Sequence, residues 1–214
     1  MMKNFDIQVD YVFPCTVYST DLSDYHDTIE EVSNEYLKKY SEQYTPSLEY
    51  PLLMSDNFSR DYRVKQFSEL LIELATNVLI DQGYAMDYYY VDLPEMWTQQ
   101  HHKYSSMERH VHGLGAHLTG FYFLKVPDNT NRILFHDPRS SKVQSQLPEA
   151  DSDTLSASST IVNYTASPGK LILTNSWLPH SFTKNFSDQP FEFVHLIFTA
   201  HNKYFNTSHN VEVV

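Results

Sequence analysis

The chain contains one cysteine, few glycines and no long run of apolar residues. Because Cys15 is the only cysteine, no disulfide can form within the chain. No apolar stretch approaches the ~20 residues that a membrane-spanning helix needs, and the N-terminal sequence MMKNFDIQVD lacks the apolar segment of a signal peptide. We therefore expect a cytoplasmic protein, located in the host cytoplasm if a phage encodes it.

Basic residues are also scarce, since 15 Lys and Arg stand against 27 Asp and Glu, for a net charge of −12 at pH 7. A surface of this sign repels phosphate backbones and anionic lipid headgroups. We expect neither nucleic acid nor a membrane as a partner. The length of 214 residues is typical of one domain with a self-sufficient core, and a homodimer is compatible with it.

Residues 1–85 predict an N-terminal strand and two helices that support the rest of the domain. The segment FDIQVDYVFPCTVYS, residues 5–19, alternates well enough to predict a strand. Apolar residues recur at three- and four-residue spacing over residues 23–44 and again over residues 67–79, which predicts two one-sided helices. The second apolar stripe stops before Gly83, a residue suited to a helix C-terminus.

Residues 86–200 predict a β-rich unit, because the hydrophobic period changes to two after Gly83. Short strands are predicted in six segments: 86–102, 116–126, 132–137, 158–166, 169–175 and 191–200. This pattern favours a sandwich or a barrel, followed by a tail at residues 201–214. Between the strands, the polar and Ser-rich residues 140–157 predict a long loop that is mobile or forms a lid over a site.

Histidines gather in the β-rich half, most closely in the stretch ERHVHGLGAH. On a strand, His110 and His112 would face the same way, about 6–7 Å apart along the backbone. If that face is internal, both rings could reach a metal about 2.0–2.2 Å away. An exposed edge strand would give the same spacing without a metal. His180, which follows an apolar strand and a Trp-Leu-Pro corner, is the candidate for a third ligand.

Together these elements resemble the iron(II)- and 2-oxoglutarate-dependent oxygenases, specifically the small bacterial and phage branch of prolyl-hydroxylase-like proteins. Over residues 88–200 the resemblance rests on five elements in order: Trp97, the H-V-H of 110–112, LTGFYFLKVP ending at Pro127, FHDPR ending at Arg139, and PGKLILTNSWLPH ending at His180. The resemblance implies a mainly β, α+β fold whose core is a double-stranded β-helix, a cupin-like jelly roll flanked by two helices. It also implies Fe(II) held by His110, His112 and His180, with 2-oxoglutarate as the cosubstrate.

The chain departs from the family pattern at two places. His112 stands where most members have Asp or Glu, so three neutral imidazoles replace two imidazoles and a carboxylate. No arginine follows the last ligand in SFTKNFSDQPFEFVHLIFTA, where the family usually has the partner of the distal carboxylate of 2-oxoglutarate. A buried carboxylate without a partner is costly, so we expect Arg139 to take this role. Pairing of Arg139 with Asp137 is the alternative.

Three further side chains are candidates for the cosubstrate site. Tyr122 could donate to a carboxylate or could lie in the core. Gln99 could line the site beside Trp97. His195 shares a strand face with Phe193, which occupies the approximate position of the missing arginine.

The resemblance implies a dioxygenase that hydroxylates a C–H bond and forms succinate and CO₂ as co-products. The substrate would be an amino-acid or peptidyl side chain, or a free small molecule. Two alternatives remain open. One is a three-histidine cupin-type metalloenzyme, with iron or another divalent ion, that does not use 2-oxoglutarate. The other is a non-catalytic jelly-roll phage protein whose histidines are incidental.

Overall fold

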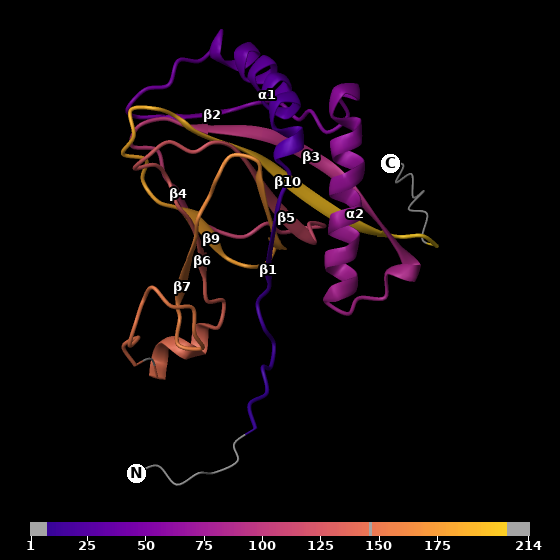
Figure 1. The fold of residues 1–214 in the computed structure, drawn as a ribbon, viewed down its shortest axis with the longest axis vertical. Coiled ribbons are helices and arrows are strands. Elements are labelled where there is room, and N and C mark those ends of the chain that lie inside the picture. Colours follow the sequence, from indigo (N-terminus) through magenta and orange to yellow (C-terminus); the bar gives the residue numbers. More distant parts are fainter. Residues whose placement is uncertain (1–7, 146, 205–214) are drawn as a thin grey trace, which may run out of the picture.

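Two α-helices occupy the predicted positions in the computed structural model, which describes residues 8–145 and 147–204 (Figure 1). They are α1 (His26–Ser41) and α2 (Lys65–Asp81). Each helix buries one apolar side, as its residue spacing predicts, and α2 ends before Gly83, whose φ is +89°. Both helix predictions are confirmed, although a short 3-10 turn at Ser23–Tyr25 precedes α1.

Strands fill most of the remaining described chain, and each of the six segments predicted to contain a strand does contain one. Their bounds are β1 (Val17–Asp21), β2 (Leu52–Met54), β3 (Tyr89–His101), β4 (Met107–His110), β5 (Leu118–Lys125), β6 (Ile133–His136), β7 (Ile161–Tyr164), β8 (Lys170–Asn175), β9 (His180–Phe182) and β10 (Phe191–Asn202). The short strands β2, β4 and β9 lie outside the six predicted segments, because three or four residues show little or no period.

The strands form two antiparallel sheets that face each other. The larger has the order β1-β8-β5-β10-β3-β2 and the smaller has the order β4-β9-β6-β7. In the described chain they remain two sheets and do not close into a barrel. The mainly β, α+β class is confirmed, with both helices attached to one face of the larger sheet (Figure 1).

Two separate cores hold these layers together. Under the helices, Ile29, Phe67 and Leu71 pack against sheet residues such as Leu173 and Leu196. Between the two sheets the core is mainly aromatic, and its buried rings are Phe121, Phe123, Phe135, Phe182, Phe191 and Phe193. The larger sheet separates the two cores, because successive residues of a strand point to opposite faces.

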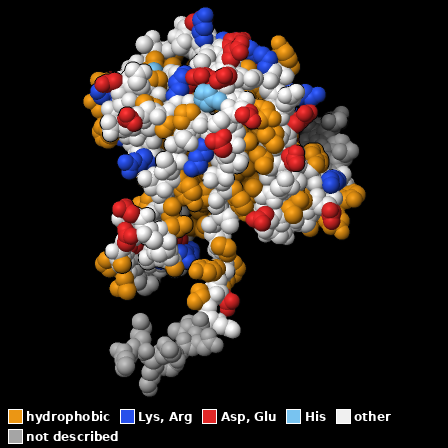
Figure 2. All heavy atoms as spheres, in the orientation of Figure 1, with side chains coloured by type: hydrophobic (Ala, Val, Ile, Leu, Met, Phe, Trp, Pro, Cys, Tyr) orange, Lys and Arg blue, Asp and Glu red, His pale blue; other side chains and the backbone are white. Residues whose placement is uncertain are grey.

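The first predicted strand is placed too early. Residues 5–7 lie outside the described residues, residues 8–16 form no strand, and β1 begins only at Val17. The alternation of residues 8–16 therefore does not reflect pairing within the chain. Their hydrophobic side chains are exposed on the extended segment that leads into β1 (Figure 2), and Tyr11 and Phe13 are 83% and 88% exposed.

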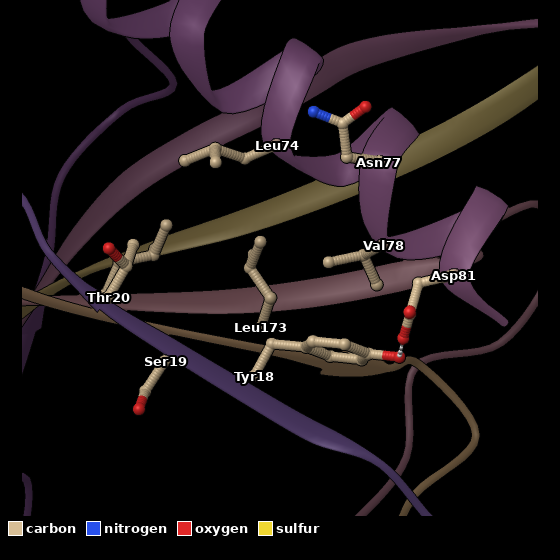
Figure 3. Close-up of a pocket in the computed structure, with 9 residues that line it drawn as sticks. Tyr18, Ser19, Thr20, Leu74, Asn77, Val78, Asp81 and Leu173 are labelled. Atoms are coloured by element: carbon tan, nitrogen blue, oxygen red, sulfur yellow. Dashed lines mark hydrogen bonds between the residues drawn. The ribbon is translucent and has the colours of Figure 1, made fainter.

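A cavity of about 440 Å³ lies between β1 and α2 (Figure 3). Its lining is mostly apolar and includes Leu74, Val78 and Leu173, while the hydroxyl of Tyr18 donates to Asp81 at 2.7 Å beside it. Val78 and Leu173 belong to the core under the helices. The cavity is therefore on the opposite side of the larger sheet from the space between the sheets.

No helix of the described chain combines the length and the apolar character that crossing a bilayer would require.

Gly169 provides a test of the fold, because its φ is +80° and there is no space beside it for a Cβ atom. A Cβ at this position would lie 2.8 Å from the Cα of Ser23, and the carbonyl of Gly169 accepts from the backbone N–H of Leu22. Gly83 also has a positive φ, but a Cβ there would meet nothing within 4 Å.

We expect Gly83→Ala to lower the free energy of unfolding by about 1 kcal/mol, the cost of a left-handed conformation. Gly169→Ala should lower it by roughly 3 kcal/mol, because a steric clash adds to the same conformational cost. Urea denaturation of both variants measures the difference. Equal losses would show that the close contact with Ser23 does not constrain the turn before β8.

Candidate metal centre

Pairing of β4 with β9 places two of the predicted ligands opposite each other. His110, the last residue of β4, has His180, the first residue of β9, as its direct cross-strand partner. Directly opposed residues of an antiparallel pair project to the same face. Their rings are accordingly close, with centroids 4.4 Å apart.

His112 reaches the same place from irregular backbone, since β4 ends at His110. The backbone N–H of His112 donates to the carbonyl of Ser176 at 2.9 Å, which holds this segment beside the corner before β9. The ring of His112 stacks against the ring of His180 with centroids 5.2 Å apart. Val111, between the two ligands, is half exposed.

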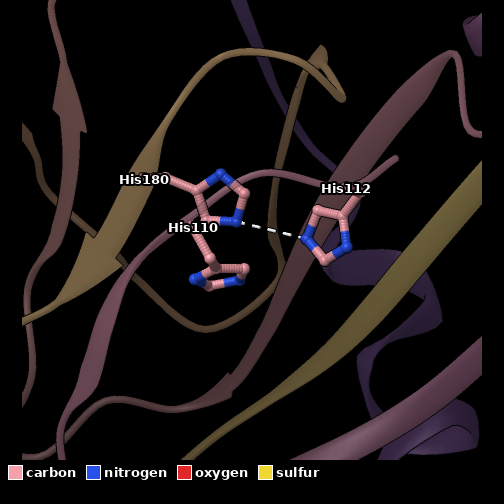
Figure 4. A group of neighbouring side chains, drawn as sticks. All are labelled: His110, His112 and His180. Atoms are coloured by element: carbon pink, nitrogen blue, oxygen red, sulfur yellow. Dashed lines mark hydrogen bonds between the residues drawn. The ribbon is translucent and has the colours of Figure 1, made fainter. Parts of the chain in front are cut away.

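The three rings converge on one point (Figure 4). One ligand nitrogen from each of His110, His112 and His180 lies within 4.8 Å of the others, and the Nε2 atoms of His112 and His180 are 3.3 Å apart. If two nitrogen atoms each lie about 2.1 Å from one ion and the angle between the two bonds is a right angle, the nitrogen atoms are about 3 Å apart. The arrangement therefore needs only small side-chain adjustments to hold an ion.

Backbone carbonyls fix which nitrogen of two rings is free. Nδ1 of His110 lies 2.8 Å from the carbonyl of Glu108, and Nδ1 of His180 lies 3.0 Å from the carbonyl of Leu178. A carbonyl only accepts, so each Nδ1 carries the hydrogen and donates it. In the neutral ring this leaves the lone pair on Nε2, the nitrogen that faces the centre of the group.

Burial keeps the rings of His112 and His180 neutral. It is the main cause that lowers the pKa of His112 to about 4 and that of His180 to about 3. A neutral imidazole is the form that binds a metal, so these two residues are in their ligand form at neutral pH without losing protons.

A fourth histidine, His195, borders the group. Its Nε2 lies 3.2 Å from Nε2 of His112, and its ring stacks on Trp97 with centroids 4.3 Å apart. The side chain is buried, its Nδ1 has no hydrogen-bond partner, and burial holds the pKa well below its usual range. His195 was predicted as a cosubstrate residue, but its contact with His112 was not predicted.

Gln99 lies on the same face as His195, two cross-strand pairs further along the sheet. Its direct partner on β10 is Phe193, whereas Trp97 is the partner of His195. Nε2 of His101 lies 3.2 Å from the amide oxygen of Gln99. The amide oxygen is therefore engaged, and the NH₂ group retains its donors for another partner.

Arg139 lies outside the space between the sheets in this structure. Its guanidinium donates to both carboxylate oxygens of Asp137, at 2.9 and 2.8 Å, and its side chain is 58% exposed. In this structure Arg139 therefore pairs with Asp137, as the alternative interpretation of the sequence expected. Binding of a cosubstrate carboxylate by Arg139 stays a prediction, and it would require the guanidinium to leave Asp137. Whether residues 140–157 form a lid also stays a prediction.

Tyr122 does not lie with the histidines, which corrects its prediction as a cosubstrate residue. Its hydroxyl donates to the carbonyl of Leu22, and its ring packs on Phe67 of α2 with centroids 4.9 Å apart. Phe121, the preceding residue, has its ring 5.2 Å from that of His180. Neighbouring residues of a strand point to opposite faces, so Tyr122 faces the helices while Phe121 faces the histidines.

The chemistry of the donor set fits a divalent metal. Three neutral nitrogen ligands suit iron, zinc, nickel or copper better than magnesium or calcium, which prefer oxygen. The same region offers less to a dicarboxylate, because none of the Lys and Arg side chains in the described residues is buried. The buried polar groups that face the interior near the histidines are uncharged, and they include His195, Thr119, Gln99 and His101.

The family model for putative 2OG-Fe(II) oxygenases matches residues 95–190 of the chain. This segment contains Trp97 and the three converging histidines. A search of curated proteins finds no match to the chain.

Several solved structures share the fold at low sequence identity. A prolyl-4-hydroxylase from Pseudomonas putida is 12% identical, with a TM-score of 0.55 over 88% of this chain and 94% of its own. A non-heme alpha-ketoglutarate-dependent carbocyclase of nogalamycin biosynthesis is 12% identical, with a TM-score of 0.59 over 88% and 82%. An epimerase of the same biosynthesis, in complex with Fe³⁺ and alpha-ketoglutarate, is 14% identical, with a TM-score of 0.53 over 88% and 81%.

We expect His110→Ala and His180→Ala each to abolish stoichiometric metal binding while the chain stays folded, because ligands on a β scaffold serve the metal more than the packing. Metal content per chain after anaerobic reconstitution, with circular dichroism as a check on folding, measures this. His201→Ala is the matched control, since His201 is exposed and stacks on Tyr90 at the far end of β10. Full metal content in either ligand variant would contradict the assignment.

Proposed function

We propose that the protein is an Fe(II)- and 2-oxoglutarate-dependent dioxygenase in which His110, His112 and His180 hold the metal, and the match of residues 95–190 to the 2OG-Fe(II) oxygenase family model supports this proposal. Its reaction would hydroxylate a C–H bond of the substrate. One oxygen atom enters the substrate and the other enters succinate, as 2-oxoglutarate loses CO₂. The substrate would be an amino-acid or peptidyl side chain, or a small molecule, and the location would be the cytoplasm.

The observation that carries this proposal is the common direction of the ligand nitrogens. His110 and His180 each donate Nδ1–H to a backbone carbonyl, which leaves Nε2 of both rings free to bind a metal, and Nε2 of His180 lies 3.3 Å from Nε2 of His112. Histidines on an exposed edge strand would have no reason to share this arrangement, and His180 is fully buried. A bound Fe(II) would supply the activation of O₂ that no side chain can provide.

The remaining residues of the site would position the cosubstrate and exclude water. His195, beside His112, can donate a hydrogen bond to an oxygen of a 2-oxo acid, and the free NH₂ of Gln99 can do the same further along the sheet. Phe121 and Trp97 flank His195 and keep water from this side of the metal. Arg139 remains a proposed partner of the distal carboxylate on sequence grounds alone.

A three-histidine metalloenzyme that does not use 2-oxoglutarate is the second candidate. The observation that favours it is the replacement of the usual carboxylate ligand by His112, together with the absence of a buried Lys or Arg in the described residues. Three neutral ligands leave a divalent ion with its full charge, which also suits zinc or an iron dioxygenase of the cupin type.

Formation of succinate separates the two candidates. Protein reconstituted with Fe(II) and given 2-oxoglutarate and O₂ should form succinate, at least by the slow turnover that occurs without a substrate. His112→Ala, measured in parallel, should form none, because it loses a ligand. Stoichiometric iron without any succinate would contradict the proposed function and favour the second candidate.

His195→Phe tests the proposed role of His195 separately from metal binding. Phenylalanine preserves the ring that stacks on Trp97 but removes the donor, so we expect unchanged iron content and at least about tenfold weaker binding of 2-oxoglutarate. Anaerobic titration followed by the visible absorption of the iron chelate measures the affinity. An unchanged affinity would remove His195 from the cosubstrate site.

A further inference from the structure

The segment that leads into β1, residues 8–16, carries an apolar stripe that the described chain leaves exposed. We call this segment the arm. Its odd positions are all apolar and are in line with the first residue of β1: Val9, Tyr11, Phe13, Cys15 and Val17. A stripe with a period of two is typical of a strand that buries one face. The arm nevertheless forms no strand, and its stripe faces solvent.

The backbone of the arm is also unpaired. No hydrogen bond between backbone groups joins residues 8–15 to another described residue. Phe13 has a φ of +58°, a conformation that costs a residue with a Cβ about 1–2 kcal/mol and that pairing as an extended strand would remove. Pro14 has no N–H to donate, which is tolerated in a strand at the edge of a sheet. The arm therefore has the features of an edge strand that lacks its neighbour.

β1 offers an open edge next to the arm. It is the last strand of the larger sheet, and β8 is its only partner among the described strands. The free N–H and C=O groups of such an edge are a template for a further strand. On the arm side of this edge the chain runs away from its own β1 (Figure 1). Folding back would need a two-residue turn at Cys15-Thr16, where the favoured turns require Asn or Gly.

We propose that two copies of this chain associate by exchanging arms, with the arm of each copy paired antiparallel to the open edge of β1 in the other. The two contacts are identical, so the assembly is a closed two-fold dimer. The two-fold axis of such a pair sets one residue opposite its own copy, and odd positions therefore stand opposite odd positions. Directly opposed residues project to the same face. The stripe of each arm thus lies on the face of Val17, which packs against the aromatic core between the sheets.

The area available is sufficient for a stable dimer. A Tyr or Phe side chain buries about 150–250 Å². Tyr11 and Phe13 of both copies, with Val9 and the surface that these side chains cover, bring the total to about 1,200 Å², the lower end of stable interfaces. A second copy is the partner that fits, because the unpaired arm and the unpaired edge are adjacent segments of the same chain. Each copy supplies what the other lacks.

The first experiment measures the mass of the full chain in solution by sedimentation equilibrium at micromolar concentration. We expect the mass of two chains. The double variant Tyr11→Ser/Phe13→Ser should associate at least about tenfold more weakly, because it removes the apolar contact. Its circular dichroism and metal content should be unchanged, since both side chains are exposed within their own chain. Leu48→Ser/Tyr62→Ser is the matched control, because these side chains are 79% and 84% exposed outside the arm.

The second experiment uses Cys15, the only cysteine, as the single site for a nitroxide spin label. Paired strands lie about 4.8 Å apart, so labels on two exchanged arms should be within about 25 Å of each other by double electron–electron resonance.

A monomeric full chain would overturn the inference. A dimer that persists in Tyr11→Ser/Phe13→Ser, an equal loss of association in the control, or a longer distance between labels would also overturn it, because the copies would then meet elsewhere. Metal content and succinate formation are measured separately, so each of these results leaves the proposed function intact.

Discussion

The register between β4 and β9 is the constraint on which the metal centre depends. This pairing sets His110 opposite His180, although the two residues are 70 positions apart in the sequence. β9 also pairs with β6, where Phe135 is the partner of His180, so the smaller sheet fixes the second ligand from both sides. A slip of one residue would turn His180 away from the interior.

The larger sheet contributes by presenting two faces of different character. One face packs under α1 and α2 through aliphatic residues such as Leu173 and Leu196, and the other carries the phenylalanines and His195. Scaffold and site are therefore two sides of one layer. The helices stabilise the sheet without approaching the histidines, as the position of Tyr122 under α2 illustrates.

Much of the fold follows from local patterns in the sequence. The apolar spacing of α2 and its end before Gly83, and the alternation in β5 and β10, depend on neighbouring residues and could be predicted. The convergence of His110, His112 and His180 came from the order of motifs in a family resemblance. The spacing alone was equally compatible with an exposed edge strand.

What could not be predicted depends on which strands are neighbours. The contact of His195 with His112, and its stacking on Trp97, require the pairing of β10 with β3 and a facing second sheet, which no local pattern encodes. Tyr122 was assigned to the wrong face for the same reason. Alternation shows that Tyr122 and Phe121 point to opposite faces of β5, but it does not show which of the two faces lies toward the histidines. For residues 8–16, alternation without a partner strand did not produce a strand.

The position of His112 beyond the end of β4 gives the three ligands unequal mechanical support. His110 and His180 belong to a strand ladder, whereas His112 is held through its bond to the carbonyl of Ser176, on a segment that continues through Gly113 and Gly115. A transient opening of this segment would detach one imidazole while the other two stay in place. Exchange of the ion with solution would then proceed through a two-coordinate state, at a rate set by the 112–117 segment and independent of global unfolding.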